Sequence, residues 1–312
     1  MGIKAIGKKA NKDFIEFLRE GSMEEFDFQR RLGKKGNSVV WQYHNRKFEY
    51  EDILQDVHWP WGGHRYFAYD LVRNIKPQTI VELGTYRGTS FFSFCQAVKD
   101  ANYDARLCAV DTWKGDKHSE FYGEEVFDGF KNIVEKHYYN LNIKTLRKSF
   151  DEAVEEIDDN SIDLLHVDGL HTYAAVKHDF ETWLPKVKKQ GIILMHDIFI
   201  SKNDYGVYKV WEELKNEYKT IEFYHSCGLG VLFKDYIPFS DFINQERELQ
   251  IRYSSLDMDK KNEERVGLLM VHNAQIADLN QQIEGIVNSM SWRLTRPLRY
   301  FHQKLLSLRE KL

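Results

Sequence analysis

The stretch TIVELGTYRGTSFFSF, Thr79–Phe94, decides the fold class of this 312-residue chain. An apolar strand leads directly into Gly84, and a helix-forming segment starts after Gly88. Glycines tolerate positive φ angles and close backbone approach, and the N-terminus of the following helix presents free N–H groups. The stretch therefore predicts a strand, a turn and a helix that can hold a polar small molecule at the carboxyl edge of a parallel sheet.

The spacing of this turn separates it from the best-known glycine turn of this kind. A dinucleotide fingerprint is G-x-G-x-x-G. Here the pattern is E-x-G-x-x-x-G, with Thr85 in place of the second glycine. An NAD-dependent dehydrogenase is therefore disfavoured, whereas a plain strand-to-helix turn without a ligand stays open.

Short apolar runs alternate with helix-forming segments through residues 71–236, which predicts crossover connections and a mainly parallel sheet. The predicted strands are Thr79–Leu83, Leu107–Val110, Lys144–Leu146, Ile162–Val167, Gly191–Met195, Ile221–Tyr224 and Val231–Phe233. The predicted helices are Ser90–Lys99, Glu124–Lys136, Asp151–Ile157, Tyr173–Leu184 and Tyr208–Glu217. Little more than Ser226–Leu229 separates the last two strands, so they form an antiparallel hairpin. The fold class is thus α/β, with a doubly wound, mainly parallel, seven-stranded sheet and a C-terminal hairpin.

Acidic residues mark the ends of four predicted crossover strands: Glu82, Asp111, Asp168 and Asp197. The carboxyl ends of parallel strands meet at the edge where open α/β sheets bind their ligands. A solvent-exposed acid can occur by chance at the end of any one strand. Acids at the ends of four predicted crossover strands favour a ligand-binding site. Two histidines, His171 and His196, occur in the same segments.

The composition excludes several classes of protein. The net charge is −4, from 44 basic and 48 acidic residues, which gives no case for nucleic-acid binding. The three cysteines, Cys95, Cys108 and Cys227, form no C-x-x-C pair and no disulfide framework. The first residues lack the apolar run of a secretory signal, and no apolar run is long enough to span a bilayer. We therefore expect a cytoplasmic protein with at most a peripheral contact to a membrane.

Five segments in this order, VELGTYRGTS, VDTWKGD, SIDLLHVDGLHTY, GIILMHDI and GVYKVWEEL, resemble class I S-adenosylmethionine-dependent methyltransferases. The resemblance is to small-molecule and sugar O-methyltransferases of bacterial polysaccharide clusters, and it covers about residues 60–235. It implies a Rossmann-like fold, S-adenosylmethionine as cofactor, and methyl transfer to a hydroxyl of a sugar or cell-surface glycan precursor. Two other functions stay open: a related small-molecule methyltransferase or hydroxylase-type enzyme, and a non-catalytic assembly subunit of a glycan-synthesis complex.

The resemblance also implies a set of cofactor-binding residues near the strand ends: Glu82, Gly84, Thr85, Gly88, Ser90, Asp111, Trp113, Ser149, Phe150 and Asp168. In this set the glycine turn lines the methionine and ribose part of the cofactor. Asp111 binds the ribose hydroxyls, and Trp113 lies next to the adenine. Phe150 has an equally good alternative as a core residue, because buried phenylalanines are common.

Methyl transfer to a hydroxyl requires that the acceptor be positioned and its proton removed. The candidate catalytic residues are Asp168, His171, His196 and Asp197. His171 is the preferred general base, because imidazole titrates near neutral pH, and its alternative is packing beside Asp168. His166 is predicted to be a hydrogen-bonded core residue. The resemblance to metal-dependent O-methyltransferases assigns Asp168 and Asp197 as tentative ligands of Mg²⁺, although His196 stands where a further carboxylate would make that site more secure.

Residues 1–70 are predicted to form a cap or lid. Their aromatic cluster HWPWGGHRYF, His58–Phe67, suits two alternatives. In the first, the cluster stacks on a sugar ring through Trp59, Trp61 and Tyr66. In the second, its aromatic side chains pack on the sheet, which is the more common role of such residues.

Residues 240–290 are predicted to form a helical extension. Residues at alternating three- and four-residue spacing, all apolar except His272, form one stripe along it: Leu269, His272, Ile276, Leu279, Ile283, Ile286 and Met290. This helix either packs on the domain or forms a coiled coil that makes a homodimer through residues 265–290. Residues 291–312 hold six basic residues and one acidic residue. This basic tail, whose SWRLTRPLR segment resembles tails of cell-surface glycan enzymes, is predicted to contact the inner face of the membrane or a glycosyltransferase complex.

Overall fold

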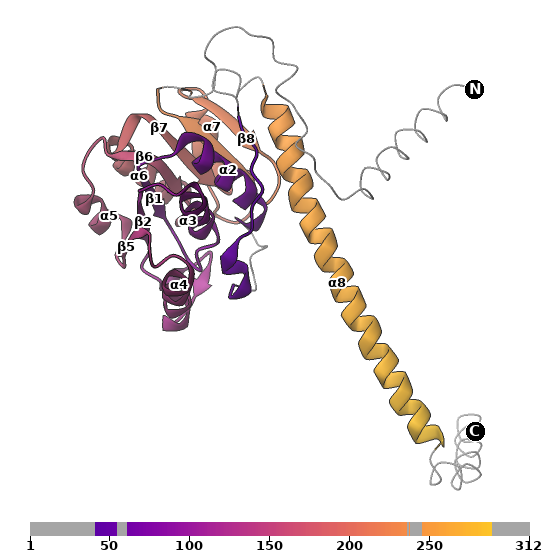
Figure 1. Ribbon diagram of the computed structural model, residues 1–312. Coiled ribbons are helices and arrows are strands. Elements are labelled where there is room, and N and C mark those ends of the chain that lie inside the picture. Colours follow the sequence, from indigo (N-terminus) through magenta and orange to yellow (C-terminus); the bar gives the residue numbers. More distant parts are fainter. Residues whose placement is uncertain (1–40, 55–60, 236, 238–244, 289–312) are drawn as a thin grey trace, which may run out of the picture. The chain divides into compact units, whose positions relative to one another are not determined.

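The computed structural model describes residues 41–54, 61–235, 237 and 245–288 (Figure 1). By its backbone contacts the chain divides into Met1–Ser38 and Val39–Leu312, and all described residues belong to the second unit. Predictions for Trp59 and for the basic tail at 291–312 lie outside the described residues. Within the predicted segment 1–70 the described part is 41–54 and 61–70.

One seven-stranded sheet organises the described residues, with the strand order β5-β2-β1-β6-β7-β9-β8. Its strands are β1 (Thr79–Leu83), β2 (Arg106–Val110), β5 (Asn142–Leu146), β6 (Ile162–Val167), β7 (Val187–His196), β8 (Lys219–Phe223) and β9 (Leu229–Phe233). The first five pair in parallel, whereas β9 lies antiparallel between β7 and β8. The predicted fold class, its seven strands and its terminal hairpin are confirmed.

Helices connect these strands in the predicted order. They are α2 (Arg65–Ile75), α3 (Thr89–Ala101), α4 (Glu124–His137), α5 (Phe150–Ala153), α6 (Tyr173–Trp183), α7 (Val207–Leu214) and α8 (Glu246–Asn288), with the 3₁₀ turns η2 (Glu49–Asp52), η3 (Trp61–His64), η4 (Val154–Glu156) and η5 (Leu184–Lys186). The sequence did not predict α2, which crosses the predicted domain boundary at residue 70. It also did not predict a small hairpin of β3 (Gly115–Asp116) and β4 (Glu120–Phe121), because two-residue strands carry no periodic pattern.

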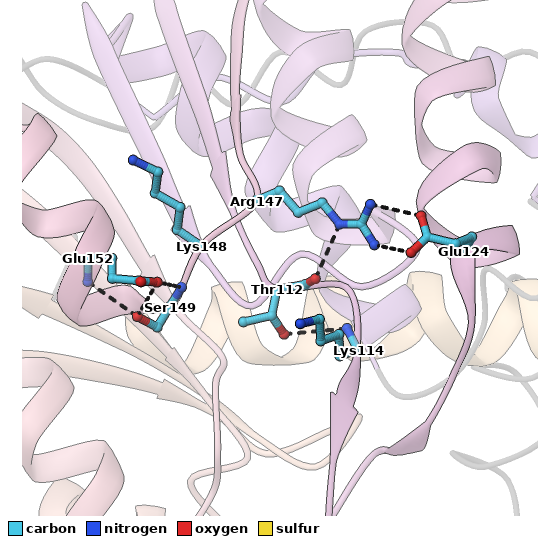
Figure 2. A pocket seen from close by; sticks show the side chains of 7 residues that line it. All are labelled: Thr112, Lys114, Glu124, Arg147, Lys148, Ser149 and Glu152. Atoms are coloured by element: carbon cyan, nitrogen blue, oxygen red, sulfur yellow. Dashed lines mark hydrogen bonds and ion pairs between the residues drawn. The ribbon is translucent and has the colours of Figure 1, made fainter.

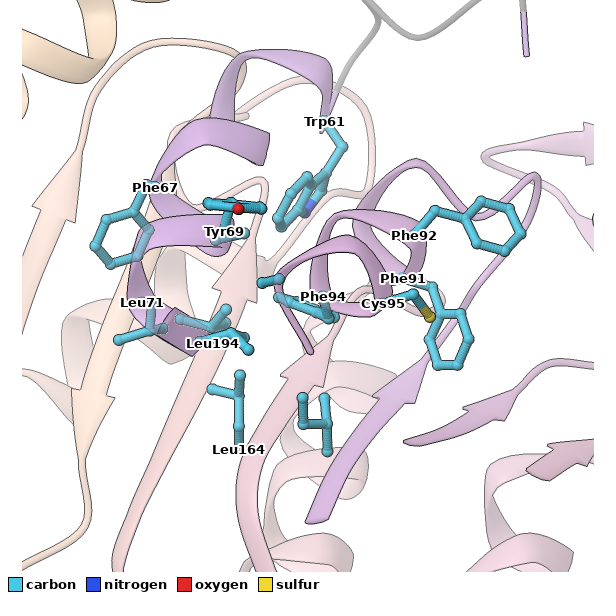
Figure 3. Close-up of a cluster of buried hydrophobic side chains, with 14 of the residues drawn as sticks. Trp61, Phe67, Tyr69, Leu71, Phe91, Phe92, Phe94, Cys95, Leu164 and Leu194 are labelled. Carbon is cyan, nitrogen blue, oxygen red and sulfur yellow. The ribbon is translucent and has the colours of Figure 1, made fainter. Parts of the chain in front are cut away.

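Two hydrophobic layers cover the two faces of the sheet. In the first layer α2, α3 and α4 pack on the sheet, and the close-up in Figure 3 shows Phe67, Phe91, Phe94, Leu164 and Leu194 there. In the second layer α5, α6 and α7 cover the opposite face. Because neighbouring residues of a strand point to opposite faces, β1 is buried along its whole length.

A buried carboxylate ties the long helix α8 to the domain. Asp70 on α2 accepts a hydrogen bond from the Tyr253 hydroxyl of α8 at 2.7 Å and another from the backbone N–H of His44 at 3.0 Å. Trp41 Nε1 donates to the same tyrosine oxygen at 3.1 Å. The start of α8 and the segment from residue 41 are therefore held at one point of the core.

The predicted long helix is confirmed as α8, but the predicted coiled coil stays a prediction. Of its apolar positions, Ile276, Leu279 and Ile283 are 55–56% exposed, and the other four side chains lie outside the described ones. Among the described residues, no helix has both the length and the apolar character needed to cross a lipid bilayer.

Candidate active site

The register of the sheet brings the predicted acids to one edge. Leu83 at the end of β1 lies opposite Val110 of β2 and Val167 of β6, and Val167 lies opposite Met195 of β7. The four strands therefore end at the same height in the sheet, and the residues that follow them begin along one edge. The predicted juxtaposition of Asp111, Asp168 and Asp197 along this carboxyl edge follows from the parallel pairing.

Steric constraints require glycine at both ends of the glycine turn, Gly84–Gly88. Gly84 has φ +88°, and a Cβ there would collide with the backbone carbonyl oxygen of Asp168. Gly88 has φ +90° and stands as N-cap of α3, where a Cβ would meet the ring of Phe92. Both positions require glycine because L side chains disfavour this backbone region and because the neighbouring atoms leave no room.

The Asp111 carboxylate holds this turn in place. Its Oδ2 accepts the backbone N–H groups of Thr85 at 2.9 Å and Tyr86 at 2.8 Å, and its Oδ1 accepts that of Trp113 at 2.7 Å. Burial raises the pKa of Asp111 even though these three donors favour its charged form. Asp111 therefore ties the backbone of the glycine turn to that of Trp113.

Trp113 packs in the core. Its indole N–H donates to the carbonyl oxygen of Tyr86 at 2.8 Å, and its ring lies about equally close to Phe127 and Phe130, with ring centroids 4.9 and 5.2 Å away. Only 1% of the residue is exposed. In this conformation Trp113 offers almost no surface to a ligand, which differs from the expected place beside adenine.

A pocket of about 400 Å³ opens where β2 and β5 end (Figure 2). It is lined by Thr112, Lys114, Glu124, Arg147, Lys148, Ser149 and Glu152. Ser149 lies in this wall as the N-cap of α5, in a capping box with Glu152. Phe150 is partly buried against the second layer, and its ring edge occupies the space that a Cβ on Gly169 would need. The packing role considered for Phe150 is thus present, and Ser149 lines the pocket.

Glu82 and His166 form a buried hydrogen-bonded pair behind the turn. The indole N–H of Trp61 donates to His166 Nε2 at 3.0 Å, so the proton of His166 lies on Nδ1, which donates to Glu82 Oε2 at 2.9 Å. His166 is fully buried, as predicted. Trp61 is 3% exposed, so it packs on the sheet and does not present an open face for a sugar ring.

Two polar atoms near the turn lack a partner in the described part of the chain: Thr85 Oγ1 and Glu82 Oε1. Buried polar atoms without a partner are unusual in folded proteins and call for an explanation such as a bound ligand. Thr85 and Ser90 both belong to the predicted cofactor set and both are buried, Thr85 in the glycine turn and Ser90 in the first turn of α3. The residues present at the turn therefore fit a polar cofactor.

Four side chains form a closed ring at the ends of β6 and β7, which we call the Asp/His ring: Asp168, His171, His196 and Asp197. His171 Nε2 lies 2.9 Å from Asp197 Oδ2 and 3.4 Å from Asp168 Oδ1. His196 Nδ1 lies 3.4 Å from Asp197 Oδ1 and 3.5 Å from Asp168 Oδ2. Each carboxylate thus faces one imidazole with each of its oxygens. All four predicted catalytic residues are brought together.

Charge coupling within the ring changes the expected protonation. Burial alone lowers the pKa of an imidazole, but the bonds to Asp168 and Asp197 raise the pKa of His171 to about 10. The same carboxylates raise the pKa of His196 against the effect of burial. Burial favours the neutral form of Asp168, but His196 and His171 hold the pKa of Asp168 well below its ordinary value. The raised pKa favours the imidazolium form of His171 while it contacts both carboxylates, and its role as general base stays a prediction.

A clasp that the sequence did not reveal covers His171. Tyr205 stacks on the His171 ring at 4.9 Å and 10°. His118 of the β3–β4 hairpin lies 4.5 Å from the Tyr205 ring at 23° and 5.7 Å from the His171 ring. Asp204 pairs with both Lys117 and His118. The hairpin follows β2 and Asp204 follows β7, so the clasp crosses the ends of the intervening strands β1 and β6. No sequence signal points to Tyr205 or His118, because their meeting depends on the strand order.

The ring also offers ligands for a metal ion. One ligand atom each from Asp168, His171 and Asp197 lies within 4.8 Å of the other two. Asp168 and Asp197 are the two predicted metal ligands, and the geometry adds an imidazole to them. Carboxylates with an imidazole suit divalent ions.

Two curated proteins are similar to part of this chain. A protein of Sinorhizobium fredii named "Uncharacterized protein y4gI" is 43% identical over 178 residues, which is 57% of this chain and 19% of that protein. "Uncharacterized protein R132" of Acanthamoeba polyphaga mimivirus is 31% identical over 125 residues, 38% of this chain and 51% of that protein. The chain thus spans about half or less of the length of these relatives.

Among solved structures, the O-methyltransferase TomG from Streptomyces achromogenes in complex with S-adenosylmethionine is similar, at 13% identity and a TM-score of 0.44, over 61% of this chain and 92% of that one. A TM-score at this level carries no inference about activity. Residues 81–198 match the family model described as "Methyltransferase domain". This segment runs from β1 to the residue after Asp197 and contains the glycine turn and the whole Asp/His ring. Over residues 81–198 the chain is therefore similar to this methyltransferase domain family.

Proposed function

We propose that the protein is an S-adenosylmethionine-dependent O-methyltransferase that acts on a hydroxyl of a sugar or glycan precursor. The observation that carries the proposal is the Asp/His ring, which lies at the same sheet edge as the glycine turn. Gly84 and Asp168 are in direct backbone contact there, so a cofactor held by the turn and an acceptor held by the ring would be neighbours.

The turn supplies the cofactor side of the proposed site. When bound, S-adenosylmethionine supplies a methyl group on a cationic sulfonium, whose C–S bond breaks as the acceptor oxygen forms the new C–O bond. Thr85 and Ser90 offer hydroxyl groups beside the turn, and Glu82 supports it from behind. Asp111 contributes by holding three backbone N–H groups, which fixes the shape of the turn before the cofactor arrives.

The ring supplies the acceptor side. His171 and His196 each face both carboxylates, so they fix the orientation of Asp168 and Asp197. The raised pKa of His171 makes its neutral form the strongest proton acceptor of the ring, whereas the lowered pKa of Asp168 makes that carboxylate a weak one, so His171 is the proposed acceptor of the hydroxyl proton. In this scheme the two carboxylates orient the imidazole of His171. The sugar or glycan part of the proposal is supported by the motif resemblance and by the SWRLTRPLR segment.

The partners are also part of the proposal. We propose that residues 265–290 pair with a second copy of the chain. The exposed side chains of Ile276, Leu279 and Ile283, which recur at three- and four-residue intervals along α8, support this pairing. The basic tail at 291–312 would dock the enzyme on an anionic membrane or a glycosyltransferase complex. Light scattering of the full chain against an Ile276→Asp, Leu279→Asp double variant tests the pairing. An unchanged mass refutes it.

Transfer of a labelled methyl group from S-adenosylmethionine to glycan extracts tests the enzyme proposal. We expect labelled methyl ether in the wild type and none in Asp168→Asn, with the affinity for the cofactor largely kept. His178→Ala is the matched control, since His178 also pairs with an aspartate but is exposed on α6, outside the ring. Full activity in Asp168→Asn would refute the role of the ring.

A further inference from the structure

We propose that Asp257 of the long helix α8 is a positioning residue for the Asp/His ring. It acts through Ser226 in the turn between β8 and β9, so that docking of α8 on the domain fixes the geometry of the ring. The inference rests on the proposed function only for the purpose of the ring. It adds a dependence on residues outside 81–198, the segment that is similar to the methyltransferase family.

The first contact joins α8 to this turn. Oδ2 of the buried Asp257 carboxylate accepts a hydrogen bond from the Ser226 hydroxyl at 3.2 Å. Lys261, one helical turn further along α8, donates to the same oxygen at 2.6 Å. Gly63 of η3 packs directly against this bond, since a Cβ at that position would collide with the Ser226 hydroxyl and the Asp257 carboxyl group. The bond between Asp257 and Ser226 therefore lies in a closely packed place, where the helix and the turn hold each other.

The second contact joins the turn to the Asp/His ring. The backbone carbonyl of Ser226 accepts a hydrogen bond from His196 Nε2 at 3.0 Å. The other nitrogen of this imidazole, Nδ1, lies 3.4 Å from Asp197 Oδ1 and 3.5 Å from Asp168 Oδ2. Because the imidazole is a rigid and fully buried ring, a displacement of the Ser226 carbonyl moves the nitrogen that faces both carboxylates. The position of the turn therefore sets the position of the ring.

The backbone of the turn depends on such contacts for its shape. Ser226, Cys227 and Gly228 follow one another with φ angles of +48°, +69° and +91°. Glycine adopts this region freely, whereas the two L residues stay there because surrounding contacts hold them. One of these contacts is the bond from α8, and another runs from the backbone N–H of Phe199 to the Cys227 carbonyl at 3.2 Å. Removal of the bond from α8 therefore releases a part of the backbone that is strained by itself.

The 3₁₀ turn η3 completes the support from a third segment. His64 Nε2 lies 3.1 Å from the Ser226 carbonyl oxygen, and His225 Nε2 lies 3.2 Å from the carbonyl oxygen of Gly63. The turn is thus held by η3 as well as by α8. All of these supporting residues lie outside 81–198, whereas the four members of the Asp/His ring lie inside it. The ring and its support therefore come from different parts of the chain.

Imidazole NMR of the full chain, labelled with ¹⁵N-histidine, tests the inference without reference to activity. His171 is the reporter, because it contacts the two carboxylates through the oxygens that do not face His196. Ser226→Ala removes the hydroxyl donor and keeps the charge of Asp257, whereas Asp257→Ala removes the acceptor. We expect both variants to shift the ¹⁵N resonances of His171 at fixed pH. They should also lower methyl transfer to glycan extracts by up to about 100-fold, since a small misplacement of reacting groups is enough for that.

Tyr253→Phe is the matched control, because Tyr253 anchors the same helix one turn earlier, through Asp70 instead of Ser226. It should leave the His171 resonances at their wild-type positions. Ser226→Ala and Asp257→Ala break one bond from opposite sides, so a single folded variant is sufficient for the test. Unchanged His171 resonances in a folded variant, or equal shifts in Tyr253→Phe, would overturn the inference. If the shifts occur in a chain that binds no S-adenosylmethionine, the methyltransferase proposal fails and the positioning role of Asp257 stands.

Discussion

Replacing Asp111 with asparagine separates an organising role from a purely ligand-binding role. The carboxylate accepts three backbone N–H groups, two on Oδ2 and one on Oδ1. Asparagine keeps one acceptor oxygen and turns an amide NH₂ toward the third donor. If its oxygen stays with Thr85 and Tyr86, the N–H of Trp113 loses its partner.

The size of the effect follows from these bonds. A hydrogen bond to a charged group contributes about 1.5–3 kcal/mol and a neutral one about 0.5–1.5 kcal/mol. Losing one charged bond and weakening two others, partly offset by no longer burying a charge, gives about 2–4 kcal/mol of lost stability. For a domain of this size each kcal/mol lowers the melting temperature by about 2–4 °C.

The assay compares urea unfolding of the ligand-free variant with calorimetry of S-adenosylmethionine binding. We expect Asp111→Asn to lose both stability and cofactor affinity. Asp163→Asn is a matched control, because the Asp163 carboxylate also accepts two backbone N–H groups, from Gln78 and Thr79, at the opposite end of β1. It should lose stability only. If ligand-free Asp111→Asn unfolds at the wild-type urea midpoint, the organising role is refuted.

Three further changes test other parts of the structure. Tyr253→Phe removes the buried hydrogen bond to Asp70 and should lower the free energy of unfolding, measured in urea, by about 1–3 kcal/mol. An unchanged urea midpoint would show that this bond does not anchor α8. Burial raises the pKa of Asp179 to about 7 from 3.8, so the folded state holds its proton more tightly than the unfolded state. Stability should therefore fall by up to about 4 kcal/mol as the pH rises from about 4 to above 7, and Asp179→Asn should flatten this fall; an identical pH profile would contradict it. Gly84→Ala forces a Cβ against the carbonyl oxygen of Asp168 at φ +88° and should abolish cofactor binding in calorimetry, whereas wild-type affinity would mean that the turn is not tightly packed.

The parts of the fold that have a periodic pattern were predictable from the sequence. The strands of the parallel sheet are apolar runs bounded by turn residues, so β1 and β6 are found at the predicted bounds. The gathering of Asp168 and Asp197 at one edge was predictable too, because parallel strands must align their carboxyl ends. The β3–β4 hairpin and α2 were missed, since the first is too short for a pattern and the second lies in a segment dominated by aromatic residues.

The chemistry of the site was less predictable than its location. The sequence places His171 near Asp168 but does not show that Asp197 lies 2.9 Å from the same nitrogen, and it is this second carboxylate that helps keep the imidazole protonated. Likewise, the sequence places Trp113 after Asp111, but its burial against Phe127 and Phe130 depends on how α4 packs. Protonation and burial depend on contacts between distant segments, which spacing along the chain does not encode.

Calorimetric titration of the full chain with S-adenosylmethionine tests the central claim most directly, because it does not require the acceptor to be known. The account predicts saturable binding of one cofactor per chain, lost in Gly84→Ala and kept in His178→Ala. A folded wild-type chain that binds neither S-adenosylmethionine nor S-adenosylhomocysteine would contradict it.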